Sequence, residues 1–193
     1  MIKSIIKIIP IVSILVILGA CGDKYEGDFS YTVKDFTFTN QDGDQLSKEE
    51  LDGKFWVADF VFTNCTSVCP AMTANMANLQ QQLDDEGMND VQLVSFSVDP
   101  DRDSPEDLKK YAKERGAINF DNWNLLTGYD FNTIKELSIK SFKSPVDKIP
   151  DTDQFTHANQ FFLVTPEGDA IKRYDGTKLA NVKDIVSDIK ELQ

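Results

Sequence analysis

The sequence predicts a single α/β domain in which helices flank a central mixed sheet. Two apolar runs, 55–62 and 91–98, have the length and composition of strands that are covered on both faces, and a helical segment follows each of them. Closer to the C-terminus, two strand-like segments are separated by a Pro-Glu-Gly-Asp turn at 166–169. Strands that alternate with helices pair in parallel, whereas a hairpin adds antiparallel strands, so the expected sheet contains both kinds of pairing.

Local patterns predict the elements of the first half of the chain. Residues 33–39 alternate apolar and polar side chains up to an Asn-Gln-Asp-Gly turn at 40–43, so we expect the domain to open with a hairpin. The first helix is expected over 70–86, where apolar residues recur at helical spacing and a glycine follows them. Ser104 suits a helix cap and Pro105 a first helical position, so the second helix is expected to begin there.

The second half of the chain completes the order of elements. A third strand is expected over 122–126 and a third helix over 130–139. The segment 142–156 contains two prolines and many polar residues, so we expect a long loop there. An antiparallel hairpin over 160–174 and a closing helix over 179–192 follow. This order of elements is the thioredoxin-like arrangement.

Residues 1–20 have the pattern of an export signal. Lys3 and Lys7 precede an apolar stretch at 8–18 that contains no charge. Because a membrane-spanning helix needs about 20 apolar residues, this shorter stretch predicts a secretory signal peptide. The stretch ends in Leu-Gly-Ala-Cys at Cys21, which resembles the lipobox of bacterial lipoproteins.

The lipobox resemblance implies that Cys21 carries a lipid such as palmitate and becomes the first residue after cleavage. An ordinary signal peptide followed by an incidental cysteine is the alternative. Residues 21–30 contain glycines and charged residues and are expected to form a flexible tether, which leaves 31–193 as the folded domain. We therefore expect a bacterial protein that is lipid-anchored to the cell membrane and faces its extracytoplasmic side.

The charge of the chain excludes one class of partner. The chain has 193 residues, with 20 Lys and Arg against 32 Asp and Glu, so its formal net charge is -12. Removal of residues 1–20 would take away two lysines, which leaves 18 positive and 32 negative side chains and a formal charge of -14. A domain this acidic, without a cluster of Lys and Arg, lacks the electrostatic footprint of nucleic-acid binding.

Cys65 and Cys69, in Cys-Thr-Ser-Val-Cys-Pro, lie between the first buried strand and the first helix. A disulfide in so short a loop constrains the unfolded chain little, so chemistry explains the pair better than stability does. Backbone N–H groups at the start of a helix favour the thiolate form. Three intervening residues leave room for a metal, and soft thiolates favour Cu(I), with Zn(II) as an acceptable competitor. A redox-active or incidental pair without metal is the alternative.

His157 is the one histidine of the chain and lies between the expected polar loop and the following strand. A surface or packing role is the common reading for a single histidine. In a thioredoxin-like sheet, however, the segment that leads into the late hairpin lies beside the active cysteines. A ring at this position is therefore placed to reach a metal that the two sulfurs hold.

Three blocks of sequence resemble the Sco/SenC family of copper-binding, thioredoxin-like proteins. They are Phe-Thr-Asn-Cys-Thr-Ser-Val-Cys-Pro at 62–70, Ser-Val-Asp-Pro-Asp-Arg-Asp-Ser-Pro-Glu at 97–106, and Thr-His-Ala-Asn-Gln-Phe-Phe-Leu-Val-Thr-Pro-Glu-Gly at 156–168. The resemblance implies that Cys65, Cys69 and His157 are copper ligands. It also implies copper as the metal, mainly as Cu(I) with Cu(II) as a second state. The implied partner is the copper-site subunit of cytochrome c oxidase.

The chain departs from the family pattern at two places. Many relatives have Pro-Asp between the cysteines, where this chain has Thr66 and Ser67, so a carboxylate near the site is missing. The family often places Asp before the histidine, where Thr156 stands. A hydrogen-bond partner for the ring therefore cannot be inferred from sequence.

Other candidate residues have simpler explanations. Asp99, Asp101 and Asp103 have the spacing of the start of a calcium loop, but the glycine and the glutamate that such a loop requires are absent at the later positions. The resemblance allows Asp99 and Arg102 to shape the rim of the site. The methionines and tryptophans of the predicted elements are expected to be core residues: Met72, Met76, Trp56 and Trp123.

The leading hypothesis is an anchored copper chaperone rather than a conventional enzyme, acting as a monomer. Copper binding requires both thiols to be reduced, so a disulfide between Cys65 and Cys69 would exclude the metal. The competing hypothesis is a thiol-disulfide oxidoreductase that reduces the cysteines of the oxidase subunit, for which His157 is dispensable. A redox sensor would use the same pair. A peroxidase is a weaker alternative, because Phe62 stands where a threonine or serine would be needed.

Overall fold

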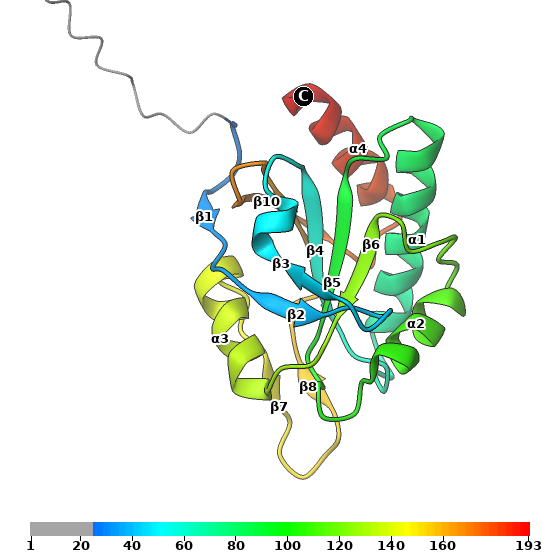
Figure 1. Ribbon diagram of the computed structural model, residues 1–193, viewed down its shortest axis with the longest axis vertical. Coiled ribbons are helices and arrows are strands. Elements are labelled where there is room, and N and C mark those ends of the chain that lie inside the picture. Colours follow the sequence, from blue (N-terminus) through cyan, green and yellow to red (C-terminus); the bar gives the residue numbers. More distant parts are fainter. Residues whose placement is uncertain (1–24) are drawn as a thin grey trace, which may run out of the picture.

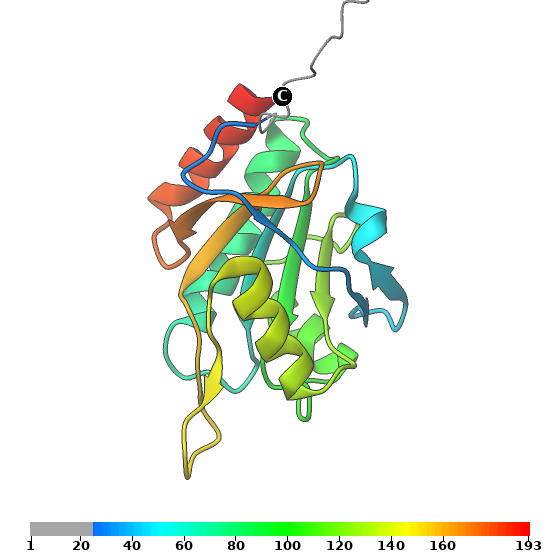
Figure 2. The same cartoon turned by 90° about the vertical axis from the view of Figure 1, so that its left-hand side faces the viewer.

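The computed structural model describes residues 25–193, which form a central mixed sheet with helices on both of its faces (Figures 1 and 2). The six strands of this sheet lie in the order β1-β10-β9-β4-β5-β6. Their bounds are β1 Tyr31–Thr32, β10 Asp169–Asp175, β9 Gln160–Val164, β4 Trp56–Val61, β5 Gln92–Ser97 and β6 Trp123–Leu126. The helices are α1 Cys69–Asp85, α2 Pro105–Lys113, α3 Phe131–Phe142 and α4 Ala180–Leu192. The mixed α/β, thioredoxin-like prediction is confirmed.

The predicted mixture of parallel and antiparallel strands is present. β4, β5 and β6 run parallel, with Phe60 opposite Phe96, whereas β9 runs antiparallel to β4 and β10. β4 and β5 are buried almost throughout, which explains their nearly continuous apolar sequences. Because parallel strands end at the same edge of a sheet, the loops after β4 and β5 meet there.

The two faces of the sheet carry different cores. One face packs against α3 and the opening hairpin and is rich in stacked and edge-to-face phenylalanines, such as Phe36, Phe60 and Phe142. The other face packs against α1 and α4 and includes Met72 and Met76, both fully buried. Trp56 and Trp123 are also buried. The predicted core role of these four methionines and tryptophans is therefore confirmed.

Two short hairpins lie outside the main sheet. The opening hairpin consists of β2 Thr37–Thr39 and β3 Gln45–Ser47, and the 3-10 helix η1 Lys48–Leu51 follows it. The prediction of a long loop over 142–156 needs correction. Helix α3 extends to Phe142, whose ring packs against the ring of Phe60, and a second hairpin follows, made of β7 Asp147–Lys148 and β8 Phe155–Thr156. Two-residue strands are too short to leave a detectable period in the sequence.

The start of the described chain is held against the domain. Residues 25–30 belong to the expected tether, yet the Tyr25 ring meets the Phe55 ring edge-on at 5.1 Å between centroids. Gly27 approaches Ile171 so closely that a Cβ at this position would lie 2.6 Å from the Ile171 carbonyl oxygen. The described part of the tether is thus packed rather than free. The predicted signal peptide and Cys21 lie outside the described residues.

Within residues 25–193, no helix is both long enough and apolar enough to cross a membrane.

Candidate metal centre

Cys65 and Cys69 lie where β4 gives way to α1. After Val61 the chain makes a tight turn in which the Cys65 N–H donates to the Phe62 carbonyl at 3.3 Å. Helix α1 begins at Cys69 and has Pro70 in its first turn, where the missing N–H of a proline costs nothing. The helix thus begins one residue before the predicted range of 70–86. The turn brings both sulfurs to the same end of the helix.

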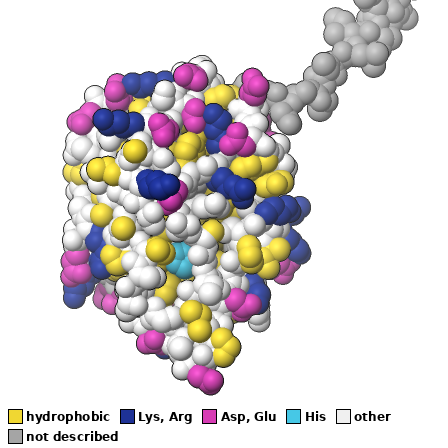
Figure 3. Space-filling model, turned by 180° about the vertical axis from the view of Figure 1, so that it is seen from behind, with side chains coloured by type: hydrophobic (Ala, Val, Ile, Leu, Met, Phe, Trp, Pro, Cys, Tyr) yellow, Lys and Arg dark blue, Asp and Glu magenta, His cyan; other side chains and the backbone are white. Residues whose placement is uncertain are grey.

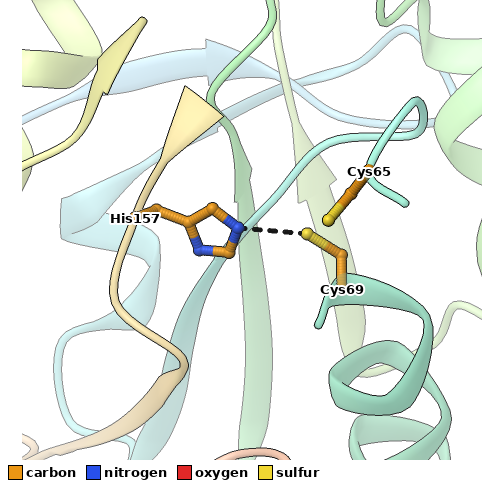
Figure 4. Close-up of side chains that lie close together, drawn as sticks. All are labelled: Cys65, Cys69 and His157. Atoms are coloured by element: carbon orange, nitrogen blue, oxygen red, sulfur yellow. Dashed lines mark hydrogen bonds between the residues drawn. The ribbon is translucent and has the colours of Figure 1, made fainter. Parts of the chain in front are cut away.

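His157 directly follows β8 and points toward the two sulfurs (Figure 4). Its Nε2 lies 3.1 Å from the Cys69 Sγ, and its Nδ1 lies 3.0 Å from the Ala158 carbonyl oxygen. Because a carbonyl only accepts, this second contact places the proton on Nδ1 and leaves the Nε2 lone pair facing the sulfur. The sequence offered no partner for the ring, and the main chain supplies one.

The three predicted ligands converge on one point. One ligand atom each of Cys65, Cys69 and His157 lies within 4.8 Å of the other two, and both cysteines are free thiols. Cys69 is completely buried and Cys65 is 7% exposed, whereas the ring of His157 is half-buried. Figure 3 shows that ring at the surface, among hydrophobic side chains. The His157 ring is therefore the most exposed of the three groups.

The two thiols have opposite acidities. The pKa of Cys65 lies well below its usual range, because the Cys69 thiol and backbone N–H groups hydrogen-bond its thiolate. The pKa of Cys69 is raised, because its S–H donates to the Cys65 thiolate and because it is buried beside that negative charge. In the reduced protein one sulfur is therefore a ready thiolate ligand, and the other must lose one proton before it can bind a metal.

Asp59, which the sequence reading did not single out, lies beneath this centre. It is opposite Ser95 in the middle of β4, it is completely buried, and neither carboxylate oxygen has a hydrogen-bond partner of ordinary geometry. Burial raises the pKa of Asp59 to about 7, against smaller opposing effects of Ser95 and the His157 ring. Its charge also contributes to the raised pKa of Cys69. The sequence carries a signal that could have identified Asp59, namely a lone carboxylate within an otherwise apolar strand.

The loop after β5 forms the rim of the site. The buried Asp103 carboxylate accepts hydrogen bonds from the Thr63 N–H, the Thr63 hydroxyl and the Ser97 hydroxyl, at 3.2, 2.6 and 2.6 Å. Asp103 therefore ties this loop to the turn that carries Cys65. The predicted cap is also present, since the Ser104 hydroxyl accepts from the Asp107 N–H at 3.2 Å.

Asp99 and Arg102 lie on the same rim. The Arg102 Nε is 3.7 Å from the Asp99 carboxylate, and its Nη1 donates to Asp153 at 3.2 Å. Asp153 in turn contacts Asn64, which directly precedes Cys65. Asn64 and Asp153 were also missed by the sequence reading, because two polar side chains so far apart in the chain give no sign of their contact.

The positions that depart from the family pattern are at the surface. The Ser67 hydroxyl lies 3.6 Å from the Cys65 Sγ and is exposed, as is Thr66. Thr156 directs its hydroxyl to the Asp147 carbonyl at 3.3 Å and not to the His157 ring. A weak sulfur contact thus stands where many relatives have a carboxylate.

The profile of the SCO1/SenC family matches residues 25–193, which is the entire described chain. The SCO1 protein homolog of Bacillus subtilis (strain 168) is 47% identical over 178 residues, which cover 92% of this chain and 91% of that protein.

Solved structures agree with this match. A SCO1/SenC family lipoprotein from Bacillus anthracis str. Ames is 47% identical, with a TM-score of 0.80 over 84% of this chain and 95% of that chain. BsSco, in which a disulfide switch is identified and which belongs to the Sco family of cytochrome c oxidase assembly proteins, is 46% identical, with a TM-score of 0.78 over 87% and 97%. Arabidopsis thaliana ScoI with copper bound is 25% identical, with a TM-score of 0.69 over 83% and 99%. This chain belongs to the SCO1/SenC family.

Proposed function

We propose that this protein holds a copper ion through Cys65, Cys69 and His157 and passes it to the copper-site subunit of cytochrome c oxidase. The observation that carries the proposal is the convergence of these ligand atoms, within 4.8 Å of one another, from segments far apart in the chain. Two thiolates and an imidazole form a soft donor set that suits Cu(I), which we take as the transported form, with Cu(II) as a second state. Related proteins of known structure contain bound copper or assemble the oxidase.

The chain prepares these donors before copper arrives. Cys65 is already the thiolate, the Nε2 lone pair of His157 faces the site, and Cys69 releases one proton as it binds. Oxidation of the two thiols to a disulfide removes both sulfur donors. Copper loading is therefore coupled to the redox state of the pair.

Anchoring through a lipid on Cys21 suits the position of the site. The described chain begins at one end of the molecule, whereas the start of α1 and the β7–β8 hairpin lie at the opposite end (Figures 1 and 2). An anchor at the N-terminal end leaves the metal centre facing away from the bilayer. We therefore propose a monomer attached to the extracytoplasmic face of a bacterial membrane, in agreement with a relative described as a lipoprotein.

Titration of the reduced protein with Cu(I), in competition with a chromophoric Cu(I) chelator, tests the proposal. The Cys65→Ser, Cys69→Ser and His157→Ala variants should each bind copper more weakly than the wild type. Met76→Leu is the matched control, because this buried sulfur belongs to the core and not to the site. Wild-type affinity in all three ligand variants would refute the proposed site.

The delivery step needs a separate measurement in cells. A strain without the gene should lose cytochrome c oxidase activity, and added copper should restore part of it. Loss of activity that copper does not restore would point away from metal delivery.

A thiol-disulfide oxidoreductase is the second candidate, and the unequal acidities of Cys65 and Cys69 favour it. The Cys65 thiolate would attack a disulfide of the oxidase subunit, and the Cys69 thiol would then resolve the mixed disulfide. One disulfide forms here while one disulfide of the client becomes two thiols, so the two electrons balance. Cys69→Ser should trap the mixed disulfide, and His157→Ala should leave the exchange rate unchanged. A redox sensor would use the same oxidation without a client.

A further inference from the structure

The β7–β8 hairpin (147–156) is the segment that places His157. In the described chain, β7 and β8 pair with each other and with no strand of the main sheet. The two ends of the hairpin continue into α3 and β9, and side-chain contacts hold the rest of it near the sulfurs. Because His157 directly follows β8, those contacts also decide how far its ring lies from Cys69.

Polar contacts join the hairpin to the residue before Cys65. The Asn64 side-chain amide donates to the Asp153 carboxylate at 2.8 Å, and the Gln154 side-chain amide donates to the Asn64 carbonyl at 3.0 Å. Arg102 donates to the same Asp153 oxygen at 3.2 Å. The Gln154 amide also donates to Asp153, at 3.1 Å. Donation from Gln154, Asn64 and Arg102 lowers the pKa of Asp153 to about 2, so its carboxylate is charged at any physiological pH. Both the side chain and the main chain of Asn64 are therefore held by the hairpin.

Aromatic contacts lie next to the polar ones. The Phe155 ring meets the Phe62 ring edge-on at 5.3 Å between centroids, and Phe62 also meets the His157 ring edge-on at 5.9 Å. Phe62 is almost completely buried, so it is a fixed surface against which the hairpin packs. The hairpin thus contacts the cysteine turn at two points, Phe62 and Asn64.

We propose that Asn64 and Asp153, supported by Gln154 and Arg102, form a latch that positions His157 beside Cys69, and that opening this latch releases the ring when copper is handed over. The inference rests on the proposed copper-carrying function. With the latch open, the ion keeps its two sulfur donors and loses its imidazole, so it is held less tightly.

The exposure of the latch suits a step that a partner triggers. The side chains of Asp153 and Arg102 are 52% and 48% exposed, so a docking protein can reach them without unfolding the domain. Hydrogen bonds and ion pairs at this exposure are individually weak, so the closed and open states differ by a small free energy. When the His157 ring is in place for only a fraction of the time, the apparent affinity of the three-donor site for Cu(I) is reduced by that fraction.

The first test is a double-mutant cycle in the full reduced protein with Cu(I) as the probe. Asp153→Ala should weaken Cu(I) affinity by about threefold to tenfold, because the ring then spends less time in place. In a His157→Ala background, Asp153→Ala should have no further effect. Asp101→Ala is the matched control, since it removes an exposed carboxylate next to Arg102.

The outcomes of this cycle separate the latch from the function on which it rests. Wild-type affinity in Asp153→Ala, or an equal loss with and without His157, would overturn the latch. Failure of the wild type itself to bind copper through its cysteines and histidine would instead overturn the proposed function.

A charge exchange gives a second test that does not depend on copper. Asn64→Asp alone places two carboxylates together and should speed backbone hydrogen exchange across 147–156. The double variant Asn64→Asp with Asp153→Asn restores an amide facing a carboxylate and should return the exchange toward wild type. Equal exchange rates in all of these proteins would contradict the latch, and a loss of melting temperature in Asn64→Asp that the double variant fails to restore would also do so.

Discussion

The two halves of the candidate metal centre are held in very different ways. The turn that carries Cys65 and Cys69 is continuous with a central strand and the first helix, and Asp103 fixes it by hydrogen bonds from Thr63. The hairpin that leads to His157 pairs only with itself among the described residues and meets the rest of the domain through side chains. The two sulfurs thus lie on segments that are continuous with the core, whereas the position of the imidazole depends on the contacts of a separate hairpin.

This difference fits the chemistry of a carrier. Two fixed sulfurs give a permanent soft donor pair, and a third donor on a separate segment can add or remove affinity without disturbing the fold. A site built entirely on buried elements would hold the ion well but would have no simple way to release it. The following predictions test the comparison, from the largest expected effect to the smallest.

The fixed donors should contribute the most to copper binding. Cys69→Ser should lower Cu(I) affinity by about a thousandfold, close to 4 kcal/mol, whereas His157→Ala should cost about tenfold to a hundredfold. The physical reason is that a neutral hydroxyl replaces a soft thiolate, while loss of the ring leaves both sulfurs in place. Chelator competition measures both values, and a larger loss for His157→Ala would reverse the assignment of fixed and movable donors.

The pH dependence of folding should reveal Asp59, which lies beneath the fixed half. Its pKa is about 7 in the folded protein and 3.8 in an unperturbed chain, so the folded state keeps a proton that the unfolded state loses between these values. Measured against the Asp59→Asn variant, in which every other group is the same, the free energy of unfolding of the wild type should therefore fall as pH rises from about 4 to 7, by up to about 4 kcal/mol, and the difference should then level off. The comparison is needed because the Cys65 thiol, whose pKa is lowered in the folded protein, contributes in the opposite direction over the same pH range.

The Asp59→Asn variant lacks this contribution, because the amide has no proton to lose. Urea unfolding of the reduced, copper-free protein at several pH values measures it, with exposed Asp35→Asn as the control. Cys69 and His157 are the ionisable groups that interact with Asp59. Repeating the comparison in the His157→Ala background removes the interaction of the ring with Asp59. A difference between the two proteins that stays constant from about pH 4 to 7 would show that Asp59 is not the source of the effect.

Phe155 should support both copper binding and folding. Phe155→Ala removes the contacts with Phe62 and Phe131, and since Phe155 is only partly buried, it should lower the free energy of unfolding by about 1 kcal/mol. Cu(I) affinity should fall by a few fold, because the hairpin then loses its aromatic contact with the cysteine turn. Ile149→Ala, at an exposed position of the same hairpin, is the control. Equal effects of both substitutions on copper affinity would show that the aromatic contact does not place the ring.

Salt should have the smallest effect. The ion pair between Arg102 and Asp153 is exposed on both sides, so screening should weaken it by no more than about 0.5 kcal/mol. Cu(I) affinity of the wild type should fall slightly between low and high ionic strength of a non-coordinating salt. The Asp153→Ala variant should show no such fall, and a salt dependence that is the same in both proteins would assign it to the overall charge.

Much of the fold was predictable because its signals are local. The apolar runs at 55–62 and 91–98 became β4 and β5, and the cap at Ser104 and the helix start near Cys69 were also predicted. The second hairpin was missed because its strands have two residues each. The packing of residues 25–30 was missed because glycines and charged residues are typical of a tether. The contact of Gly27 with Ile171 joins segments that are far apart in the sequence, so no local pattern predicts it.

By itself, the sequence determined the candidate donor residues and the elements that carry them. Two thiols around a strand-to-helix turn, and a single histidine before a late strand, are patterns that can be read one segment at a time. Only the tertiary structure decided that Asp59 is buried without a partner, that the Cys65 thiolate is stabilised, and that Asn64 meets Asp153. These properties depend on distances between atoms from different segments. Burial and charge acquire their strength only when the fold removes water and brings those atoms together.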